Sequence, residues 1–304
     1  MSSASALLER IPEVEARRSA VLAPLTTFRI GGPAELLLVP QSRAGLEAAL
    51  AQVRRSGLPL LAIGAGSNLL ISEAGFAGVA VKIGSGLAPV RVEENRLIAD
   101  AGRTLPDLMR RARRAGLSGL EFAGGIPGSL GGSLKMNAGA WHRDMAGIAD
   151  WMVGVNEAGE TVRVETSEIA WSYRSARFPQ PMTIVEAALR LTPEDPKAIE
   201  EREEGWHAAR RRTQPLGEPS AGCVFKNPPG DYASRLIDGA GLKGERVGGA
   251  MVSPVHANFI VNAGGATARE VMNLIDRVRE RVLAVHGVAL ELEVQLVGLG
   301  AGGA

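Results

Sequence analysis

Glycine is concentrated in two short stretches of this sequence, and the second stretch constrains the fold most. Between Gly124 and Gly132 (GGIPGSLGG), five of the nine residues are glycine, and Asn137-Ala138-Gly139-Ala140 follows shortly after. Such a loop exposes several backbone N–H donors, which suits a pyrophosphate or the polar edge of a planar cofactor. A flexible surface loop is the alternative interpretation.

The first stretch, Gly64-Ala65-Gly66-Ser67-Asn68, directly follows a predicted buried strand. Small residues in this place let backbone amides approach a phosphate closely. The dinucleotide fingerprint requires a third glycine where this chain has Leu69, so a classical Rossmann site is not supported. An ordinary tight turn stays open as an alternative, but two glycine clusters in one chain favour a bound dinucleotide.

Length, charge and cysteine content exclude several other classes of protein. The chain has 304 residues, enough for two or three folding units, and its net charge of +1 gives no field for gripping nucleic acid or an anionic membrane. One cysteine cannot form an internal disulfide, and the four histidines lack metal-ligand spacing, so no metal site is predicted. Without a signal-peptide core or a long apolar run, we expect a cytoplasmic protein that does not enter membranes.

The spacing of apolar residues along the sequence predicts a mixed fold of the α+β class. Helices are expected over 42–57, 104–116, 196–212 and 267–287, and the last has the predicted buried stripe Val271, Leu274, Ile275, Val278, Val282 and Val285. Strands are expected over 58–63, 79–83 and 290–296, with an antiparallel sheet within 151–191 that turns at 156–159. The arginine runs 110–114 and 210–212 are interpreted as solvated helix faces.

Three side chains outside the glycine clusters are candidates for chemistry. Cys223 lies between small residues and a Lys-Asn-Pro turn, and it is either a small buried hydrophobe or a thiol placed to exchange a proton. Arg174 ends the central β region, and Glu293 lies on the last predicted strand. As functional groups they suit stabilisation of an anionic intermediate and proton transfer; otherwise they are a solvated strand end and a surface carboxylate.

Taken together, these segments resemble the UDP-N-acetylenolpyruvoylglucosamine reductase family, from Thr26-Thr27-Phe28-Arg29-Ile30-Gly31-Gly32 to Glu293-Val294. Only 49 positions separate Arg174 from Cys223, as in the shorter, type II form of the family. The resemblance implies a two-subdomain FAD-binding half of the vanillyl-alcohol-oxidase (PCMH) type plus a smaller α+β substrate-binding domain. The corresponding divisions are 1–83 and 84–205 for FAD, 206–298 for substrate, and a flexible tail over 299–304.

The resemblance also implies roles for individual residues. Arg174, Cys223 and Glu293 are the implied catalytic set, in which Cys223 replaces a serine that usually donates the proton. A thiol is a stronger acid than a hydroxyl, so it suits that role, which solvent or Glu293 also suits. Tyr173, Lys226 and Asn227 are implied substrate contacts. The implied FAD contacts are Arg29, Gly64, Ala65, Gly66, Ser67, Asn68, Leu69, Gly124, Ile126, Pro127, Gly128, Gly131, Asn137, Ala138, Gly139 and Ile184.

The implied activity is NADPH-dependent, FAD-mediated reduction of UDP-N-acetylglucosamine enolpyruvate to UDP-N-acetylmuramate for peptidoglycan synthesis. Because the glycine loops contain neither histidine nor cysteine, FAD is expected to bind without a covalent link. Two rival interpretations are kept. One is an FAD-dependent oxidase or dehydrogenase for another substrate, and the other is a nucleotide-sugar sensor without turnover. The oligomeric partner is not predicted.

Overall fold

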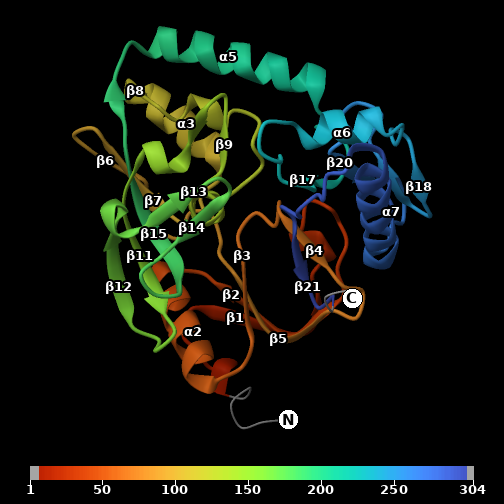
Figure 1. Cartoon of the computed structure of the whole chain (residues 1–304). Helices are drawn as coiled ribbons and strands as arrows, with labels where there is room; N and C mark the ends of the chain where they lie inside the picture. Colours follow the sequence, from red (N-terminus) through yellow and green to blue (C-terminus); the bar gives the residue numbers. More distant parts are fainter. Residues whose placement is uncertain (1–6, 300–304) are drawn as a thin grey trace. The chain divides into compact units, whose positions relative to one another are not determined.

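The computed structural model describes residues 7–299, which form two compact units (Figure 1). Unit 1 comprises residues 7–19, 35–65 and 78–209, and unit 2 comprises 20–34, 66–77 and 210–299. Each unit has its own hydrophobic core. Residues 20–34 and 66–77, which the sequence analysis places in the first subdomain, thus cluster with the C-terminal residues. The predicted flexible tail lies outside the described residues from residue 300 onward.

The predicted strand–helix–strand unit with a glycine loop is confirmed in the first part of the chain. Helix α2 (Arg43–Ser56) begins after Ser42, whose side chain accepts a hydrogen bond from the Gly45 amide, and ends at Gly57 with φ of +70°. Strand β3 (Leu60–Ile63) pairs in parallel with β5 (Phe76–Lys82). The sheet order is β1 (Val14–Val21), β2 (Pro33–Pro40), β5 and β3.

The predicted antiparallel sheet is also confirmed in unit 1. Its strand order is β12 (Thr161–Glu165), β11 (Ala149–Asn156), β15 (Met182–Arg190), β7 (Arg96–Asp100) and β6 (Arg91–Glu93). The hairpin between β11 and β12 turns where expected, with the Gly159 amide donating to the Asn156 carbonyl. Buried residues of this sheet and of α2 belong to the same hydrophobic core.

Shorter elements complete unit 1. Its other helices are α3 (Leu105–Arg114), the short α4 (Leu130–Lys135) and most of α5 (Pro196–Thr213), and its short strand pairs are β8 (Leu117–Ser118) with β16 (Thr192–Pro193), β9 (Gly139–Ala140) with β10 (Arg143–Asp144), and β13 (Ala170–Ser172) with β14 (Ser175–Arg177). The single-turn helices η2 (Glu121–Ala123), η3 (Met145–Gly147) and η4 (Thr166–Glu168) connect them. Helices α3 and α5 confirm two predicted helices.

Unit 2 is an antiparallel sheet with helices. The sheet order is β17 (Ser220–Cys223), β20 (Phe259–Asn262), β19 (Ala250–Val252) and β18 (Arg246–Val247). The other elements are η1 (Ala23–Leu25), α6 (Ala233–Gly239), α7 (Ala268–His286), and the parallel pair β4 (Leu69–Ile71) and β21 (Gln295–Val297). The predicted capping box of α7 is present between Thr267 and Glu270, and the helix ends at Gly287 with φ of +67°.

Three sequence predictions are wrong in detail. The strand predicted over 290–296 is reduced to β21, because the amides of Glu293 and Val294 both hydrogen-bond to the Val224 carbonyl and this interrupts a regular ladder. Val285 is 44% exposed rather than part of the buried stripe of α7. Arg210, expected on a solvated face, is buried near the end of α5.

Neither a membrane-spanning helix nor a metal-binding cluster is found among the described residues. None of the helices within residues 7–299 combines the length and apolar character needed to span a bilayer. Over the same residues, the structure shows no group of three or more His, Cys, Asp or Glu side chains arranged to hold a metal ion.

A buried carboxylate anchors the turn that leads into the glycine loop at Gly124. The Glu121 carboxylate, in a residue 2% exposed, accepts hydrogen bonds from the Ser118 hydroxyl (2.8 Å), the Gly119 amide (2.6 Å) and the Arg202 guanidinium (2.9 Å). Burial alone would raise the pKa of Glu121, but these hydrogen bonds outweigh burial and hold the pKa below its ordinary value of 4.5. The Glu121 carbonyl in turn accepts from the Gly124 amide.

We predict that Glu121→Gln lowers the free energy of unfolding at neutral pH by about 1–3 kcal/mol, because an amide cannot satisfy the same donors. Since the folded-state pKa is lowered, the carboxylate stabilises the fold above pH 4.5, and this contribution is lost as pH falls through the lowered pKa. The difference in Tm between wild type and variant should therefore narrow below pH 4.5. Glu204→Gln, exposed on α5, is the control and should show no such pattern. A pH-independent difference for Glu121→Gln would contradict the prediction.

Candidate active site

Within unit 1, the two glycine stretches meet at Gly64 and Ser129. A Cβ on Gly64 would lie 2.1 Å from the Ser129 Oγ, so any other residue at this position would force the Ser129 hydroxyl to move. The ammonium group of Lys82, at the end of β5, donates to the Gly64 carbonyl. Burial lowers the pKa of Lys82. The predicted cofactor residues Gly64 and Ala65 therefore lie with the second glycine loop and beside a cationic side chain.

The second glycine loop is fixed to the end of β7 by backbone hydrogen bonds. The amides of Gly131 and Leu130 donate to the carbonyls of Ala101 and Arg103, each at 2.8 Å. A Cβ on Gly131 would lie 2.8 Å from the Ala101 Cβ, so this contact also requires glycine. The Gly128 carbonyl accepts from the Leu105 amide. The loop is thus a packed structural element, in contrast to the flexible surface loop that was the alternative.

The segment Asn137–Gly139 follows α4 and leads into β9. The Asn137 carboxamide is buried and hydrogen-bonds to protein groups: its Nδ2 donates to Asp144 Oδ2 (3.1 Å) and to the Ser172 carbonyl (3.0 Å), and its Oδ1 accepts from the Ala146 amide (2.9 Å). Any contact of Asn137 with a cofactor would therefore use its backbone. Asn137 also has a left-handed φ of +42°.

Arg174 lies in the tight turn between β13 and β14, where Ser172 and Ser175 are paired. Its φ is +54°, a conformation that costs a residue with a Cβ about 1–2 kcal/mol. Its Nη1 donates to the Gly139 carbonyl at 3.1 Å, and its guanidinium lies 5.1 Å from the centre of the Tyr173 ring. The structure thus brings Arg174 together with the predicted cofactor residues Asn137 to Gly139. Strained backbone of this kind is frequent at functional sites.

In unit 2, Thr27 ties the first glycine stretch to β17. Its amide donates to the Gly66 carbonyl (3.2 Å), and its hydroxyl donates to the Ser220 carbonyl (2.6 Å). A Cβ on Gly66 would lie 2.1 Å from the Leu25 carbonyl oxygen. Arg29 follows in the next turn with φ of +58°, and its side chain is exposed. Ser67 is half-buried, and Leu69 is buried at the start of β4.

Cys223 and Glu293 also lie in unit 2, on adjacent backbone segments. Cys223 is half-buried at the end of β17, opposite Phe259. The Glu293 amide donates to the carbonyl of Val224, the residue after Cys223, at 2.8 Å. The Asn68 carboxamide donates to the Glu293 carbonyl at 3.0 Å. Three sequence-predicted residues, Asn68, Cys223 and Glu293, are therefore brought together.

The remaining candidates are spread over both units. In unit 2, the Lys226 ammonium lies 3.4 Å from Glu291 Oε2, and Asn227 Oδ1 accepts from the Ala233 amide at the start of α6. In unit 1, Tyr173 is 51% exposed, whereas Ile184 is buried in β15 and belongs to the hydrophobic core. Gly124, Ile126, Pro127 and Ala138 lie in the two segments described above for unit 1.

Sequence reasoning missed several residues that shape these segments. Lys82 ends a strand pattern, Ser129 lies inside the glycine cluster, and Thr27 lies inside a motif already singled out, so each carried a usable signal. Asn258 carried none: its buried carboxamide donates to the Phe225 carbonyl (2.8 Å) and accepts from the Phe225 amide (3.0 Å). It thereby holds the backbone next to Lys226.

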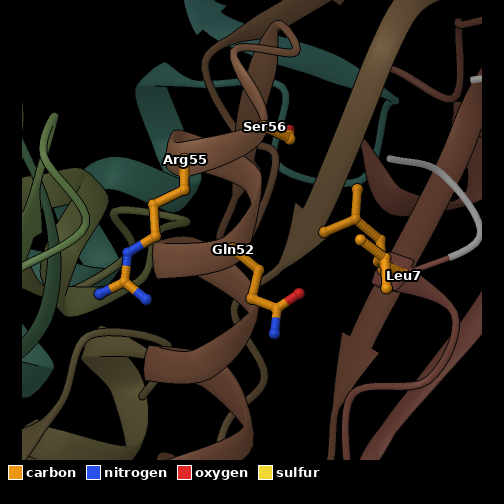
Figure 2. A pocket seen from close by; sticks show the side chains of 5 residues that line it. Leu7, Gln52, Arg55 and Ser56 are labelled. Carbon is orange, nitrogen blue, oxygen red and sulfur yellow. The ribbon is translucent and has the colours of Figure 1, made fainter. Parts of the chain in front are cut away.

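A cavity elsewhere in unit 1 contains none of the candidate residues. It has a volume of about 270 Å³ and is lined by Leu7, Leu8, Gln52, Arg55 and Ser56 (Figure 2). Figure 2 shows the side chains of Gln52 and Arg55 projecting from α2. The Arg55 Nη2 also donates to the Gly159 carbonyl at 3.4 Å. The candidate residues and this cavity are therefore separate features of the unit.

The chemistry of unit 1 fits the dinucleotide cofactor that the sequence predicts. Two glycine turns approach one another without Cβ atoms, and the Lys82 ammonium lies at their contact. Backbone amides on glycine turns and a neighbouring cation are the groups that bind a diphosphate. Gly64, Ala65 and the 124–132 loop would hold that part of FAD.

We predict that Gly64→Ala weakens FAD binding at least tenfold, because the new methyl group must displace the Ser129 hydroxyl. Ser129→Ala in the same chain should recover part of the affinity, since it removes the clashing oxygen. Gly147→Ala is the matched control, because no atom lies within 4 Å of the position of its Cβ. FAD affinity is measured by fluorescence titration of the apoprotein. Equal affinities for Gly64→Ala and Gly147→Ala would refute the packing argument.

Comparison with known proteins agrees with both units. Residues 34–165 match the family model of an FAD-binding domain, and residues 214–297 match that of the UDP-N-acetylenolpyruvoylglucosamine reductase C-terminal domain. The UDP-N-acetylenolpyruvoylglucosamine reductase of Moorella thermoacetica is 47% identical over 279 residues, covering 90% of this chain and 91% of that protein. The protein of the same name from Heliobacterium modesticaldum is 45% identical over 275 residues, covering 90% and 88%.

A solved structure gives the same result. The crystal structure of UDP-N-acetylenolpyruvylglucosamine reductase from Thermus caldophilus has a TM-score of 0.79 and 36% identity, covering 93% of this chain and 98% of that one. The predicted fold, an FAD-binding half with a further α+β domain, is confirmed by these matches. The chain belongs to the UDP-N-acetylenolpyruvoylglucosamine reductase family.

Proposed function

We propose that this chain is a flavin-dependent oxidoreductase that reduces UDP-N-acetylglucosamine enolpyruvate to UDP-N-acetylmuramate for peptidoglycan synthesis, with NADPH as the reductant. The observation that carries the proposal is the 47% identity to a reductase of this name over 90% of the chain. The local geometry supports it, since Arg174 is held in one unit and Cys223 and Glu293 in the other, each by defined backbone contacts. Bound FAD supplies a hydride carrier between the nicotinamide and the terminal methylene carbon of the enolpyruvyl group.

Arg174 has the chemistry to stabilise the negative charge that develops on the enolpyruvyl carboxylate when hydride is added. A guanidinium is cationic at all relevant pH values, and its planar donors match a carboxylate. Its bond to the Gly139 carbonyl fixes one end of the fork before substrate binds. A preorganised cation lowers the barrier because no group has to reorient as the charge forms.

Cys223 and Glu293 are the proposed proton-transfer groups. After hydride addition to the methylene carbon, the adjacent carbon must accept a proton to complete the reduction. Cys223 is proposed as the donor of this proton. Glu293, whose backbone amide donates to the Val224 carbonyl, is proposed as a second proton-transfer group. Tyr173, Lys226 and Asn227 are proposed substrate contacts.

Two further statements remain predictions. The division of the chain into FAD-binding residues 1–83 and 84–205 and substrate-binding residues 206–298 is one of them. A cytoplasmic location is the other, because the proposed reductant and nucleotide-sugar substrate are cytoplasmic metabolites.

The proposed activity is tested by anaerobic stopped-flow absorbance of the purified holoprotein. NADPH should bleach the flavin band, and UDP-N-acetylglucosamine enolpyruvate should then restore it. Bleaching without recovery would move the assignment to an oxidase or dehydrogenase for another substrate. Failure to bind FAD at all would overturn the cofactor assignment, and tight binding of the UDP sugar without turnover would favour a sensor.

We predict that Cys223→Ala leaves reduction by NADPH nearly normal and slows reoxidation by the substrate about 10²-fold or more, the usual contribution of a general acid. Cys223→Ser should retain much of the activity, because a hydroxyl can replace the thiol as donor. The two half-reactions are measured separately in the stopped-flow instrument. Equal slowing of both half-reactions by Cys223→Ala would remove Cys223 from the proton-donor role.

A further inference from the structure

We propose that Asn137 is a positioning residue for Arg174, acting through its side chain rather than binding the cofactor with it. The inference rests on the proposed function, in which Arg174 stabilises the reacting carboxylate. It is carried by the contacts that the Asn137 carboxamide makes with two hairpins of unit 1, the β9–β10 hairpin and the β13–β14 hairpin.

The Asn137 carboxamide has each of its main hydrogen-bonding positions occupied. An amide group offers two N–H donors and an oxygen acceptor. The two donors are directed to Asp144 Oδ2 (3.1 Å) and the Ser172 carbonyl (3.0 Å), and the oxygen accepts from the Ala146 amide (2.9 Å). The residue is 3% exposed, so loss of these bonds would leave polar groups buried without partners. A carboxamide whose donors and acceptor are all bonded to the protein stabilises the local structure.

These hydrogen bonds contact the two hairpins around Arg174: the one that accepts its guanidinium and the one that carries it. Asp144 and Ala146 belong to or follow β10, whose partner strand β9 contains Gly139, the acceptor for Arg174 Nη1. Ser172 ends β13 and precedes the Tyr173-Arg174 turn. Asn137 therefore joins the strand that receives the guanidinium to the hairpin that carries it.

The turn itself needs such support. Arg174 has φ of +54°, a region that a residue with a Cβ adopts only where the surroundings impose it. Ser172 and Tyr173 are exposed, and neither side chain belongs to the hydrophobic core of unit 1. The hydrogen bond from Asn137 to the Ser172 carbonyl acts two residues before the strained position. Its loss should broaden the range of guanidinium positions without removing the charge.

The main test compares Asn137→Ala with Asn156→Ala in the holoprotein. Asn156 is a matched control in the same unit: it is 5% exposed, its Nδ2 contacts Glu160 Oε2 and Gln180 Oε1, and its Oδ1 accepts from the Glu160 amide. Both variants should lose thermal stability. Only Asn137→Ala should slow flavin reoxidation by UDP-N-acetylglucosamine enolpyruvate, by at least tenfold, while reduction by NADPH stays within about twofold of wild type.

An exchange of side chains separates positioning from stability. Asn137→Asp combined with Asp144→Asn reverses donor and acceptor, so it restores the bond between these residues but leaves the Ser172 carbonyl without its donor. We expect the double variant to regain most of the Tm lost in Asn137→Asp and to keep the slow reoxidation. Hydrogen exchange should remain faster than in wild type at the amides of 172–175, a readout that does not depend on turnover.

The outcomes distinguish the inference from the proposed function. If wild-type flavin is not reoxidised by the enolpyruvyl sugar, the proposed function fails, and the hydrogen-exchange comparison alone decides whether Asn137 holds the turn. If wild type turns over but Asn137→Ala and Asn156→Ala slow reoxidation equally, the positioning role is refuted. If Asn137→Ala binds FAD more weakly while hydrogen exchange at the amides of 172–175 is normal, the Asn137 side chain contributes to cofactor binding, and the inference is overturned.

Discussion

The close approach of Gly64 to Ser129 is the contact on which the proposed cofactor site depends. A Cβ at position 64 would meet the Ser129 oxygen at 2.1 Å, so the two glycine turns of unit 1 make this contact without displacing the Ser129 hydroxyl only while position 64 is glycine. The Lys82 ammonium lies at the same carbonyl, and the backbone bonds of Leu130 and Gly131 fix the second turn to the end of β7. These glycines thus allow close backbone packing because they have no Cβ.

The elements with strong local signals were predictable from the sequence. The α2 and α7 helices have an N-cap side chain at one end and a left-handed glycine at the other, and both were located to within a residue or two. The strand expected over 290–296 failed because alternation reports which side chains are buried, whereas pairing is decided by partners distant in sequence. Here Val224 accepts two successive amides and Asn68 accepts the next, so Glu293 lies in an irregular segment.

The candidate site shows the same limit. Sequence motifs identified the candidate residues, but they did not indicate which groups each side chain contacts. Asn137 and Asn68 both follow glycine-rich turns, yet the carboxamide of each bonds to the chain itself, Asn137 to Ser172 and Asn68 to the Glu293 backbone. Asn258 had no signal at all, because a single buried carboxamide is recognisable only once Phe225 is placed beside it. Polar contacts between residues distant in sequence produce no periodic pattern from which they could be predicted.

In each unit a backbone carbonyl contacts a proposed catalytic residue. Arg174 donates to the Gly139 carbonyl, and the Glu293 backbone is fixed by Val224 and Asn68. The Gly139 carbonyl orients the guanidinium without adding an opposite charge at that contact. A cation oriented in this way interacts more strongly with the transition state, in which further negative charge develops next to the carboxylate, than with the ground-state enol ether, and this difference in binding accelerates a reaction. The left-handed strain at Arg174 is then a cost of orientation, met by hydrogen bonds that lie entirely within one unit.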